Sequence, residues 1–327
     1  MSIPYVTLSD PRYGEAVQVA PLIRRVIARN AGKFSYLGTG TYIVGEGDVA
    51  VIDPGPLVES HREALMAALA GQRVRAILVT HCHRDHSPLA AWLAEYSGAP
   101  TVAFGPHVTD PNWIEDDNEP IDPADMESDA DDPLAQIGES DEDESVESVD
   151  TAFVPDVRVT TGEVAVEGDG YTLRAVHTPG HTSNHLAFWF DEQRALFSGD
   201  HIMGWSTTVI TPPDGDMRDY FESLQRVRDL APATLWPTHG SPVTDTVPFI
   251  DAFVAHRLGR EAQVLAAVRG GVSSIPEMVP VLYASVDKRL HRAARRSVLA
   301  HMLKLVADGL VVFEGERAGV MTPYHPA

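Results

Sequence analysis

The sequence predicts an α+β fold in which two packed β-sheets are covered by helices and followed by a small helical domain. Short apolar runs bounded by turn residues occur in both halves of the first 240 residues, with helical patterns between them. The runs at 76–81 and 233–239 both pass from an apolar strand into Thr-His, which indicates two similar halves that meet. A chain of 327 residues is long enough for one large core and a second, smaller one.

The predicted elements of the first domain follow one another in order. Residues 41–44 and 49–52 flank a turn at 45–48 and predict a β-hairpin. Further strands are expected at 76–79, 171–176 and 185–190. Helices are expected at about 60–70, 88–97 and 217–230, where apolar residues recur at helical spacing.

A small C-terminal domain of helices and one hairpin is predicted after residue 255. A long helix over 247–268 leads out of the first domain, and the last long helix ends at Asp308-Gly309, before a short strand and turn at 310–315. The buried stripe of that last helix is expected to be Leu290, Ala294, Val298, Met302 and Leu305. Helices followed by a hairpin are typical of a winged-helix module, so the predicted domains are 1–255 and 256–327.

Basic residues gather in this second domain. Residues 256–305 contain nine Arg or Lys and three Asp or Glu. Arg289, Arg292 and Arg296 fall on the face of the last helix opposite the buried stripe, where they could contact phosphates of a nucleic acid. An ordinary solvated helix face or a packing module explains the pattern equally well, because the whole chain uses 22 Arg and 3 Lys.

The net charge of -22 comes mainly from one segment. Residues 115–150 hold 17 Asp or Glu and no Lys or Arg, which leaves 30 acidic and 25 basic residues elsewhere. Sparse apolar content and charge repulsion predict a disordered insertion over 107–152 in the first domain. The segment is either a solvated loop or an acidic flap that competes with anionic substrates.

Seven residues can be interpreted as one metal site. His81 and His83 follow an apolar strand and project to the same side, whereas Asp85 and His86 come round the next turn toward a second ion. The others each follow an apolar segment or a turn signal: His181, Asp200 and His239. A carboxylate that reaches both ions would hold them as a two-metal hydrolytic site, and Asp200 is the candidate. Cys82, between two ligands, is expected to point away as a small buried residue.

These residues resemble a known family. The sequence HCHRDH at 81–86, followed by His181, Asp200 and His239, is similar to the metallo-β-lactamase superfamily of metallohydrolases. Residues 37–42, 52–55 and 204–208, with the helical C-terminal extension, look like the branch of the β-lactamase-like protein 2 endoribonucleases. The resemblance covers nearly the whole chain except about 107–152. It implies an αββα metallo-β-lactamase sandwich with a small C-terminal winged-helix-like domain.

The chemistry expected of this site is hydrolysis by a metal-bound hydroxide. His81, His83 and His181 would hold one metal, and Asp85, His86 and His239 the other, with Asp200 bridging. Asp85 is the candidate catalytic residue, which orients the hydroxide or takes its proton. Asp53 and His185 are expected to support the ligands from behind. Two divalent ions are expected, with zinc favoured by the ligand types, although iron or manganese would accept the same set.

Three functions remain open on these grounds. The first is an endoribonuclease on single-stranded RNA, which the branch resemblance implies. The second is an acyl hydrolase, acting as a thioesterase, a lactonase or a glyoxalase II-like enzyme on a small-molecule substrate. The third is a nucleic-acid-binding protein with a structural metal site. The N-terminal residues show no secretory signal and no transmembrane candidate occurs, so we expect a cytoplasmic protein without a membrane partner. The oligomeric state stays open.

Overall fold

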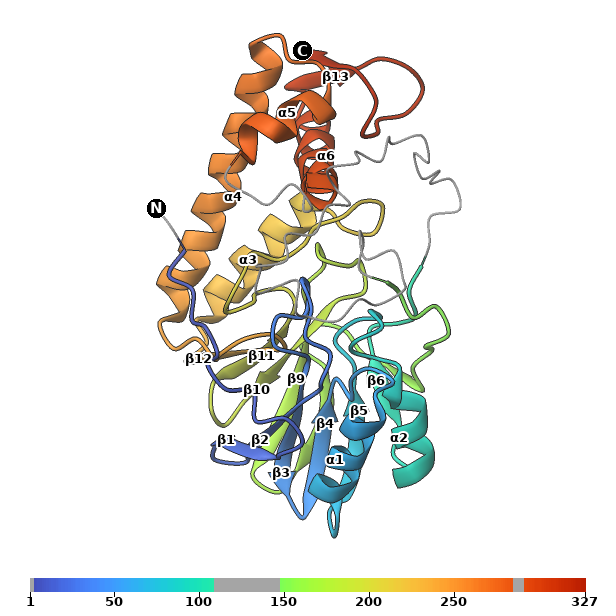
Figure 1. Ribbon diagram of the computed structural model, residues 1–327. Helices are drawn as coiled ribbons and strands as arrows, with labels where there is room; N and C mark the ends of the chain where they lie inside the picture. Colours follow the sequence, from blue (N-terminus) through green and yellow to red (C-terminus); the bar gives the residue numbers. More distant parts are fainter. Residues whose placement is uncertain (1–2, 109–147, 285–290) are drawn as a thin grey trace.

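The computed structural model describes residues 3–108, 148–284 and 291–327. Two β-sheets lie face to face, with helices on their outer faces and a helical domain beyond one end of the sandwich (Figure 1). This is the predicted αββα arrangement. The predicted hairpin at 41–52 and the three helices of the first domain are confirmed.

The first sheet carries seven strands in the order β1-β2-β3-β4-β5-β6-β7. Their bounds are Val17–Ala20, Ile23–Ile27, Gly40–Glu46, Asp48–Ile52, Arg73–Leu78, Thr101–Ala103 and Val157–Arg158. The first four strands pair antiparallel, whereas β4 to β7 are parallel neighbours. The parallel strands β4 and β5 end at the same edge, and this edge carries the metal-ligand sequence.

The second sheet carries five strands in the order β12-β11-β10-β9-β8. Their bounds are Val164–Gly168 for β8, Tyr171–His177 for β9, Leu186–Phe190 for β10, Ala195–Gly199 for β11 and Thr234–Pro237 for β12. β11 and β12 are parallel, so their carboxyl ends also lie at one edge. Chain segments that leave the ends of both sheets can therefore meet above the sandwich.

The side chains of each strand divide between two apolar layers. Phe188 of β10 packs between the sheets with Leu78 and Phe197, whereas its neighbour Ala187 packs outward against the helices. Helices α1 (Glu59–Leu69) and α2 (Leu89–Ser97) cover the first sheet. Helices α3 (Met217–Leu230) and α4 (Thr246–Arg269) cover the second. Because close-packed side chains cover both faces of each sheet, the two sheets have little freedom to shift against each other.

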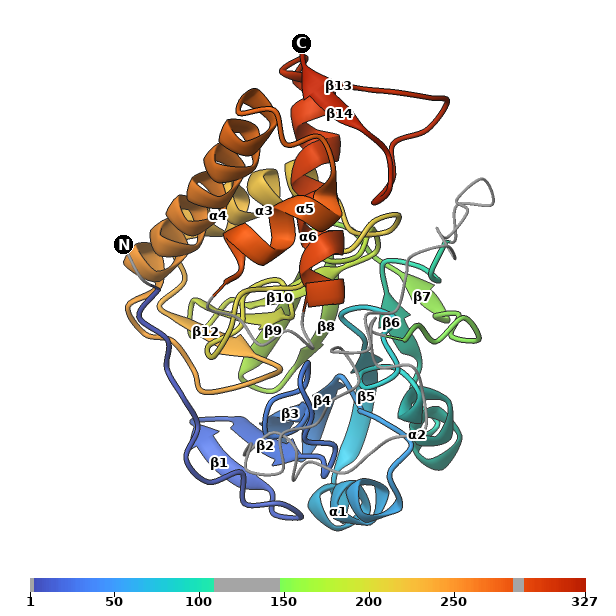
Figure 2. The ribbon, with the colours of Figure 1, turned by 45° about the horizontal axis from the view of Figure 1, so that its top comes forward.

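The C-terminal domain is built from the end of α4, α5 (Ile275–Leu282), α6 (His291–Ala307) and the hairpin of β13 (Val311–Phe313) and β14 (Tyr324–Pro326) (Figure 2). The predicted boundary at 255/256 lies inside α4. Ala294, Val298, Met302 and Leu305 are buried as predicted, and Leu290 lies outside the described residues. No helix in the described part of the chain has the length and apolar character that crossing a bilayer requires.

The predicted disordered insertion over 107–152 is wrong at its C-terminal end. Ser148 accepts a backbone hydrogen bond from Arg84, Val149 forms a β-bridge with His83, and Asp150 donates from its amide to the carbonyl of Cys82. Side-chain pairing adds to this, since the Ser87 hydroxyl donates to Asp150 Oδ2 at 2.7 Å. Unpaired backbone groups of the metal-ligand turn need partners, and 148–150 supplies them. The rest of the acidic segment, 109–147, lies outside the described residues.

Candidate metal centre

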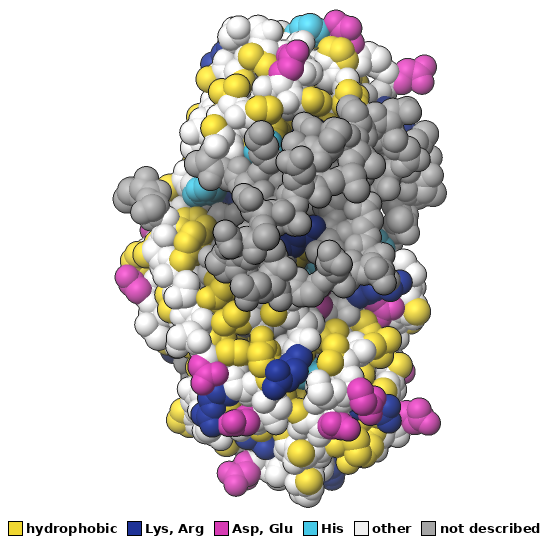
Figure 3. All heavy atoms as spheres, viewed as in Figure 1, with side chains coloured by type: hydrophobic (Ala, Val, Ile, Leu, Met, Phe, Trp, Pro, Cys, Tyr) yellow, Lys and Arg dark blue, Asp and Glu magenta, His cyan; other side chains and the backbone are white. Residues whose placement is uncertain are grey.

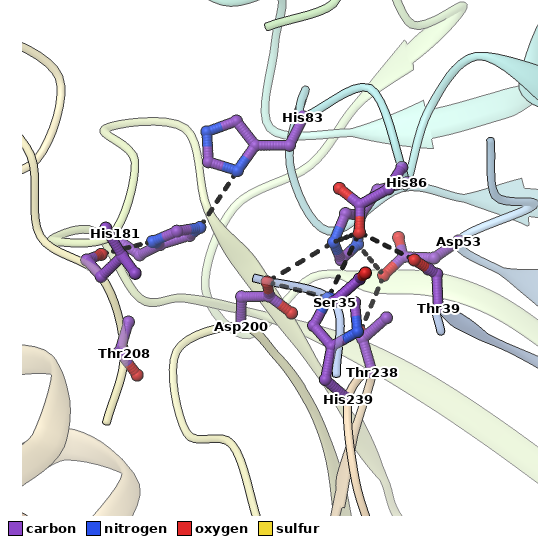
Figure 4. A network of polar contacts seen from close by, with 12 residues as sticks. Ser35, Thr39, Asp53, His83, His86, His181, Asp200, Thr208, Thr238 and His239 are labelled. Carbon is purple, nitrogen blue, oxygen red and sulfur yellow. Dashed lines mark hydrogen bonds and ion pairs between the residues drawn. The ribbon is translucent and has the colours of Figure 1, made fainter. Parts of the chain in front are cut away.

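The structure brings all seven predicted metal ligands together at one end of the sandwich. Figure 4 labels five of them: His83, His86, His181, Asp200 and His239. The 81–86 segment follows β5, and His181 lies in the turn between β9 and β10. Asp200 directly follows β11, and His239 lies just after the end of β12. Each ligand therefore lies on a short segment held by a buried strand. Six of the seven are buried, and Asp85 is partly exposed.

Three histidines form the first group of donor atoms. His81 Nε2 lies 2.9 Å from His83 Nδ1, and His83 Nδ1 lies 3.2 Å from His181 Nε2. The donor atoms all lie within 4.8 Å of one another, which is the spacing of atoms that ligate one ion. The predicted first ligand triad is thus assembled from two segments almost a hundred residues apart.

The second group contains Asp85, His86 and His239. Asp85 Oδ2 lies 3.2 Å from His239 Nε2 and 3.4 Å from His86 Nε2. Asp200 Oδ2 lies 3.3 Å from His239 Nε2 and 3.6 Å from His86 Nε2, and Asp200 also groups with His81 and His86. Asp200 therefore lies between the two groups, as a bridging carboxylate must.

Two buried polar atoms show that this donor set fits cations. Among the described residues, Asp200 Oδ1 and His86 Nε2 are shielded from solvent and have no partner within hydrogen-bond distance, the carboxylate oxygens nearest His86 Nε2 lying 3.4 and 3.6 Å away. Leaving such atoms unpaired costs about 1–3 kcal/mol each, more for a charged group. Divalent ions at the two groups would satisfy both, and imidazole with carboxylate is a donor set for zinc and related metals.

The outward-facing nitrogens of three ligand rings fix which nitrogen carries the proton. His86 Nδ1 donates to Asp53 Oδ2 at 2.9 Å, His181 Nδ1 to the Val209 carbonyl at 2.6 Å, and His239 Nδ1 to the Gly38 carbonyl at 3.3 Å. Each partner is an acceptor, so Nδ1 carries a proton and Nε2 is the nitrogen left to ligate a metal. These contacts orient the rings before a metal binds.

Asp53 accepts hydrogen bonds from several residues around the ligands, which is consistent with the supporting role predicted for it. Its carboxylate accepts from the Thr80 amide and hydroxyl, both at 2.8 Å, and from Thr238 Oγ1 at 3.2 Å, in addition to His86. Asp53 has a positive φ of 51°, so the backbone turns sharply at the end of β4 to deliver it. His185 has the same kind of role, because its Nε2 accepts from the Asp200 amide at 3.3 Å.

Two residues of this layer escape prediction from residue type. Thr39 Oγ1 donates to Asp85 Oδ2 at 2.7 Å, and Asn30 Nδ2 donates to Thr39 Oγ1 at 2.8 Å. The motif at 37–42 contained Thr39, but nothing in the sequence pairs it with Asp85, 46 residues later. Asn30 carries no sequence signal.

In the metal-free protein, four of the ligand histidines fall into two sets, one with lowered and one with raised pKa values. Burial, together with neighbouring imidazoles, lowers the pKa of His83 to about 3 and holds that of His81 well below its usual value. Burial also disfavours charge on His239, but Asp200 and Asp85 outweigh it and raise its pKa to about 10. The two carboxylates lie at the second group, where they stabilise a proton on His239 in the metal-free protein. A cation bound at this group would displace that proton.

Cys82 does not join the site. Its side chain packs in the apolar layer under α2, and its sulfur lies 3.0 Å from Asn184 Nδ2 and 3.8 Å from the Gly105 carbonyl oxygen. Burial raises the pKa of the thiol to about 11. The alternating direction of side chains after β5 thus separates Cys82 from the two flanking ligands, as predicted.

The predicted phosphate-binding face of α6 is wrong at Arg296. This side chain is buried, with 8% exposure, so it does not face solvent. Helix α6 packs against α4, α5 and α3, which leaves less solvated surface than an isolated amphipathic helix would have. Arg289 and the side chain of Arg292 lie outside the described residues.

Comparison with known proteins agrees with the fold and the site. Residues 37–239 match the metallo-β-lactamase superfamily, and this span contains all seven ligands. The chain belongs to the metallo-β-lactamase superfamily. Residues 274–319 match the β-lactamase-associated winged helix domain, which confirms the C-terminal module of this superfamily member.

Similar metallo-β-lactamase proteins cover both domains. The β-lactamase-like protein 2 homolog of Caenorhabditis elegans is 31% identical over 90% of this chain and 87% of its own length. An atrochrysone carboxyl ACP thioesterase of Pseudocercospora fijiensis is 28% identical over 96% of this chain and 83% of its own. A β-lactamase domain protein from Burkholderia ambifaria shares the fold, with a TM-score of 0.73 and 23% identity over 99% of this chain and 97% of the other. With the metal groups above, this makes the protein a metallo-β-lactamase-fold hydrolase and sets aside the binding protein with a structural metal.

Proposed function

We propose that this hydrolase cleaves acyl bonds, with a thioester as its substrate class and two zinc ions as its cofactors. Asp200 between two donor groups carries the hydrolytic part of the proposal, because this is the layout of a two-metal site. The thioesterase relative supports the acyl assignment, because its similarity extends over 96% of this chain. Five imidazoles and two carboxylates are ligands that suit zinc.

His81, His83 and His181 would hold one cation and Asp85, His86 and His239 the other, and bound there the two would supply a water of lowered pKa and polarise the bond to be cleaved. The chain's own residues supply orientation. Asp85, the proposed catalytic residue, is a carboxylate whose pKa lies below its usual range, because His86 and His239 outweigh the effect of burial. A carboxylate that stays ionised can accept a hydrogen bond from water at this site. Thr39 holds that carboxylate in a fixed direction.

RNA cleavage is the second candidate, since phosphodiesters need the same ligands. It requires a basic surface, and the buried Arg296 removes one of the three proposed contacts. On the face in Figure 3, Lys and Arg of the sandwich are interspersed with Asp and Glu, so the coloured part of that face is not continuously basic. These observations favour the acyl substrate.

A direct test compares turnover of an acyl-thioester panel with turnover of single-stranded RNA, with metal content measured on the same preparation. We expect two metal equivalents and thioester hydrolysis that is lost in Asp200→Ala. Cleavage of RNA without thioester turnover would replace the acyl proposal with the nuclease. Iron or manganese in the active preparation would correct the metal but not the reaction.

A further inference from the structure

Arg257 of α4 is a buried cation that contacts a backbone carbonyl and an aromatic ring. The residue is 4% exposed, and no ion pair among the described residues includes it. Its Nη2 donates to the Thr208 carbonyl, and its guanidinium carbon lies 5.6 Å from the centre of the Tyr220 ring. Burying a charge costs several kcal/mol unless polar groups compensate it. A carbonyl of the 201–209 segment is therefore part of what holds this side chain.

The same segment is tied down at its other end. Thr208 Oγ1 donates to the His201 carbonyl at 2.8 Å, and Tyr220 Oη donates to that carbonyl at 3.0 Å. Arg257 and Tyr220 thus hold the two ends of a segment that has no regular secondary structure. Without helix or sheet hydrogen bonds, such a segment depends on side-chain contacts of this kind for its conformation.

One residue separates the Arg257 contact from the metal centre. Val209 follows Thr208, and its carbonyl accepts the hydrogen bond from His181 Nδ1 at 2.6 Å. Figure 4 shows Thr208 beside His181. A hydrogen bond to the Thr208 carbonyl restrains the plane of the Thr208–Val209 peptide, so that only φ and ψ of Val209 separate this restrained plane from the carbonyl that His181 contacts.

The helix that carries Arg257 belongs to both domains. Phe249 and Phe253 at its start pack in the layer over the second sheet, whereas Val264 and Val268 near its end pack in the C-terminal domain. Arg257 lies between these two halves. A shift of α4 against the sandwich would therefore move the group that holds the 201–209 segment.

We propose that Arg257 is a positioning residue for His181: it fixes the Thr208 carbonyl, and thereby the Val209 carbonyl that orients the ligand ring. The C-terminal domain is linked to the metal centre through this contact. The proposal concerns the metal centre alone and does not depend on whether the substrate is a thioester or RNA.

Zinc titration of the metal-free Arg257→Met variant tests this role. Methionine keeps an unbranched side chain but removes every donor, so the Thr208 carbonyl loses its hydrogen bond from α4. We expect one of the two zinc equivalents to bind more weakly, by up to about 10–100-fold, which is the cost of losing a ligand's own hydrogen-bond partner. Backbone hydrogen exchange in 201–210 should also become faster in the metal-free state. Parental affinity for both equivalents in a folded variant would overturn the proposal.

Arg260→Met is the matched control, because Arg260 lies one turn further along α4. Its Nη1 donates to the Leu282 carbonyl at 2.7 Å and it stacks on Tyr283, both in the C-terminal domain. This variant should bind both zinc equivalents like the parent. Equal weakening in the two variants would show a general effect of disturbing α4, and the positioning role of Arg257 would be rejected.

A measurement on the parent protein covers the case in which Arg257→Met does not fold. If Arg257 positions His181, zinc at His181 must in turn strengthen the Arg257 contact, because coupling between two sites is reciprocal. Zinc should therefore slow exchange of the Arg257 guanidinium protons with solvent, as seen by nitrogen-15 NMR. Unchanged exchange on zinc binding would contradict the proposal without any substitution.

Discussion

Thr39 Oγ1 donates a 2.7 Å hydrogen bond to Asp85 Oδ2, the oxygen that also lies 3.2 Å from His239 Nε2. The Thr39 hydroxyl already accepts from Asn30 Nδ2 at 2.8 Å, which leaves its own proton for Asp85. The relationship joins a loop before β3 to the metal-ligand turn. It makes the direction of the Asp85 carboxylate a property of the apo fold rather than of the bound metal.

Replacing Thr39 by Val should weaken the binding of one of the two metal equivalents. The substitution keeps the side-chain shape but removes the donor to Asp85 and leaves Asn30 Nδ2 unpaired, so we expect about 10–100-fold weaker binding and a loss of about 1–3 kcal/mol in unfolding free energy. Metal titration and urea unfolding measure the two effects. Thr39→Ser, which keeps the hydroxyl, should restore most of the affinity, and equal loss in both variants would disprove the hydrogen-bond argument.

Asp200→Ala should lose at least one metal and most activity while the protein stays folded. The carboxylate lies within 3.6 Å of ligand nitrogens of His86 and His239, so its removal takes a donor from between the two groups. Metal analysis and circular dichroism on one preparation give the answer. Two equivalents and parental turnover in the variant would mean that Asp200 does not bridge.

Cys82 should be inert to thiol reagents in the native protein. Reaction requires the thiolate, and burial holds the pKa of this thiol near 11. Labelling with a disulfide reagent at pH 8 should therefore be slow until urea unfolds the chain. Cys82→Ser should keep both metals, and rapid native labelling or loss of a metal equivalent would place the thiol at the centre after all.

His61 should make the protein less stable at acid pH. Its ring is buried beneath Thr41, and burial lowers its pKa from 6.5 to about 4. Between pH 6.5 and about 4, His61 is protonated in the unfolded chain but neutral in the folded protein. The free energy of unfolding therefore falls as the pH drops to about 4 and then levels off. The loss is about 3 kcal/mol. Urea unfolding at pH 7 and pH 4 should show a pH dependence smaller by that amount in His61→Gln, and an identical dependence would refute the assignment.

Residue type and spacing were sufficient to predict the seven side chains that the structure gathers into the donor groups. An imidazole or carboxylate at the end of a buried strand has few structural uses, and seven of them in this order are typical of a two-metal site. The same local signals predicted the 41–52 hairpin and α1 to α3. The short strands β6 and β7 were missed because two or three residues carry no periodic pattern, and their pairing depends on β5 beside them.

By itself, then, the sequence predicted which side chains gather into the two donor groups and that Cys82 stays outside them, because the alternation of side chains is a local property of the chain. Tertiary structure decided how those ligands are oriented. Thr39 meets Asp85, Arg257 meets Thr208, and Val149 pairs with His83 across separations that no local pattern encodes. It also buried Arg296, since the exposure of a helix face depends on which helices pack against it.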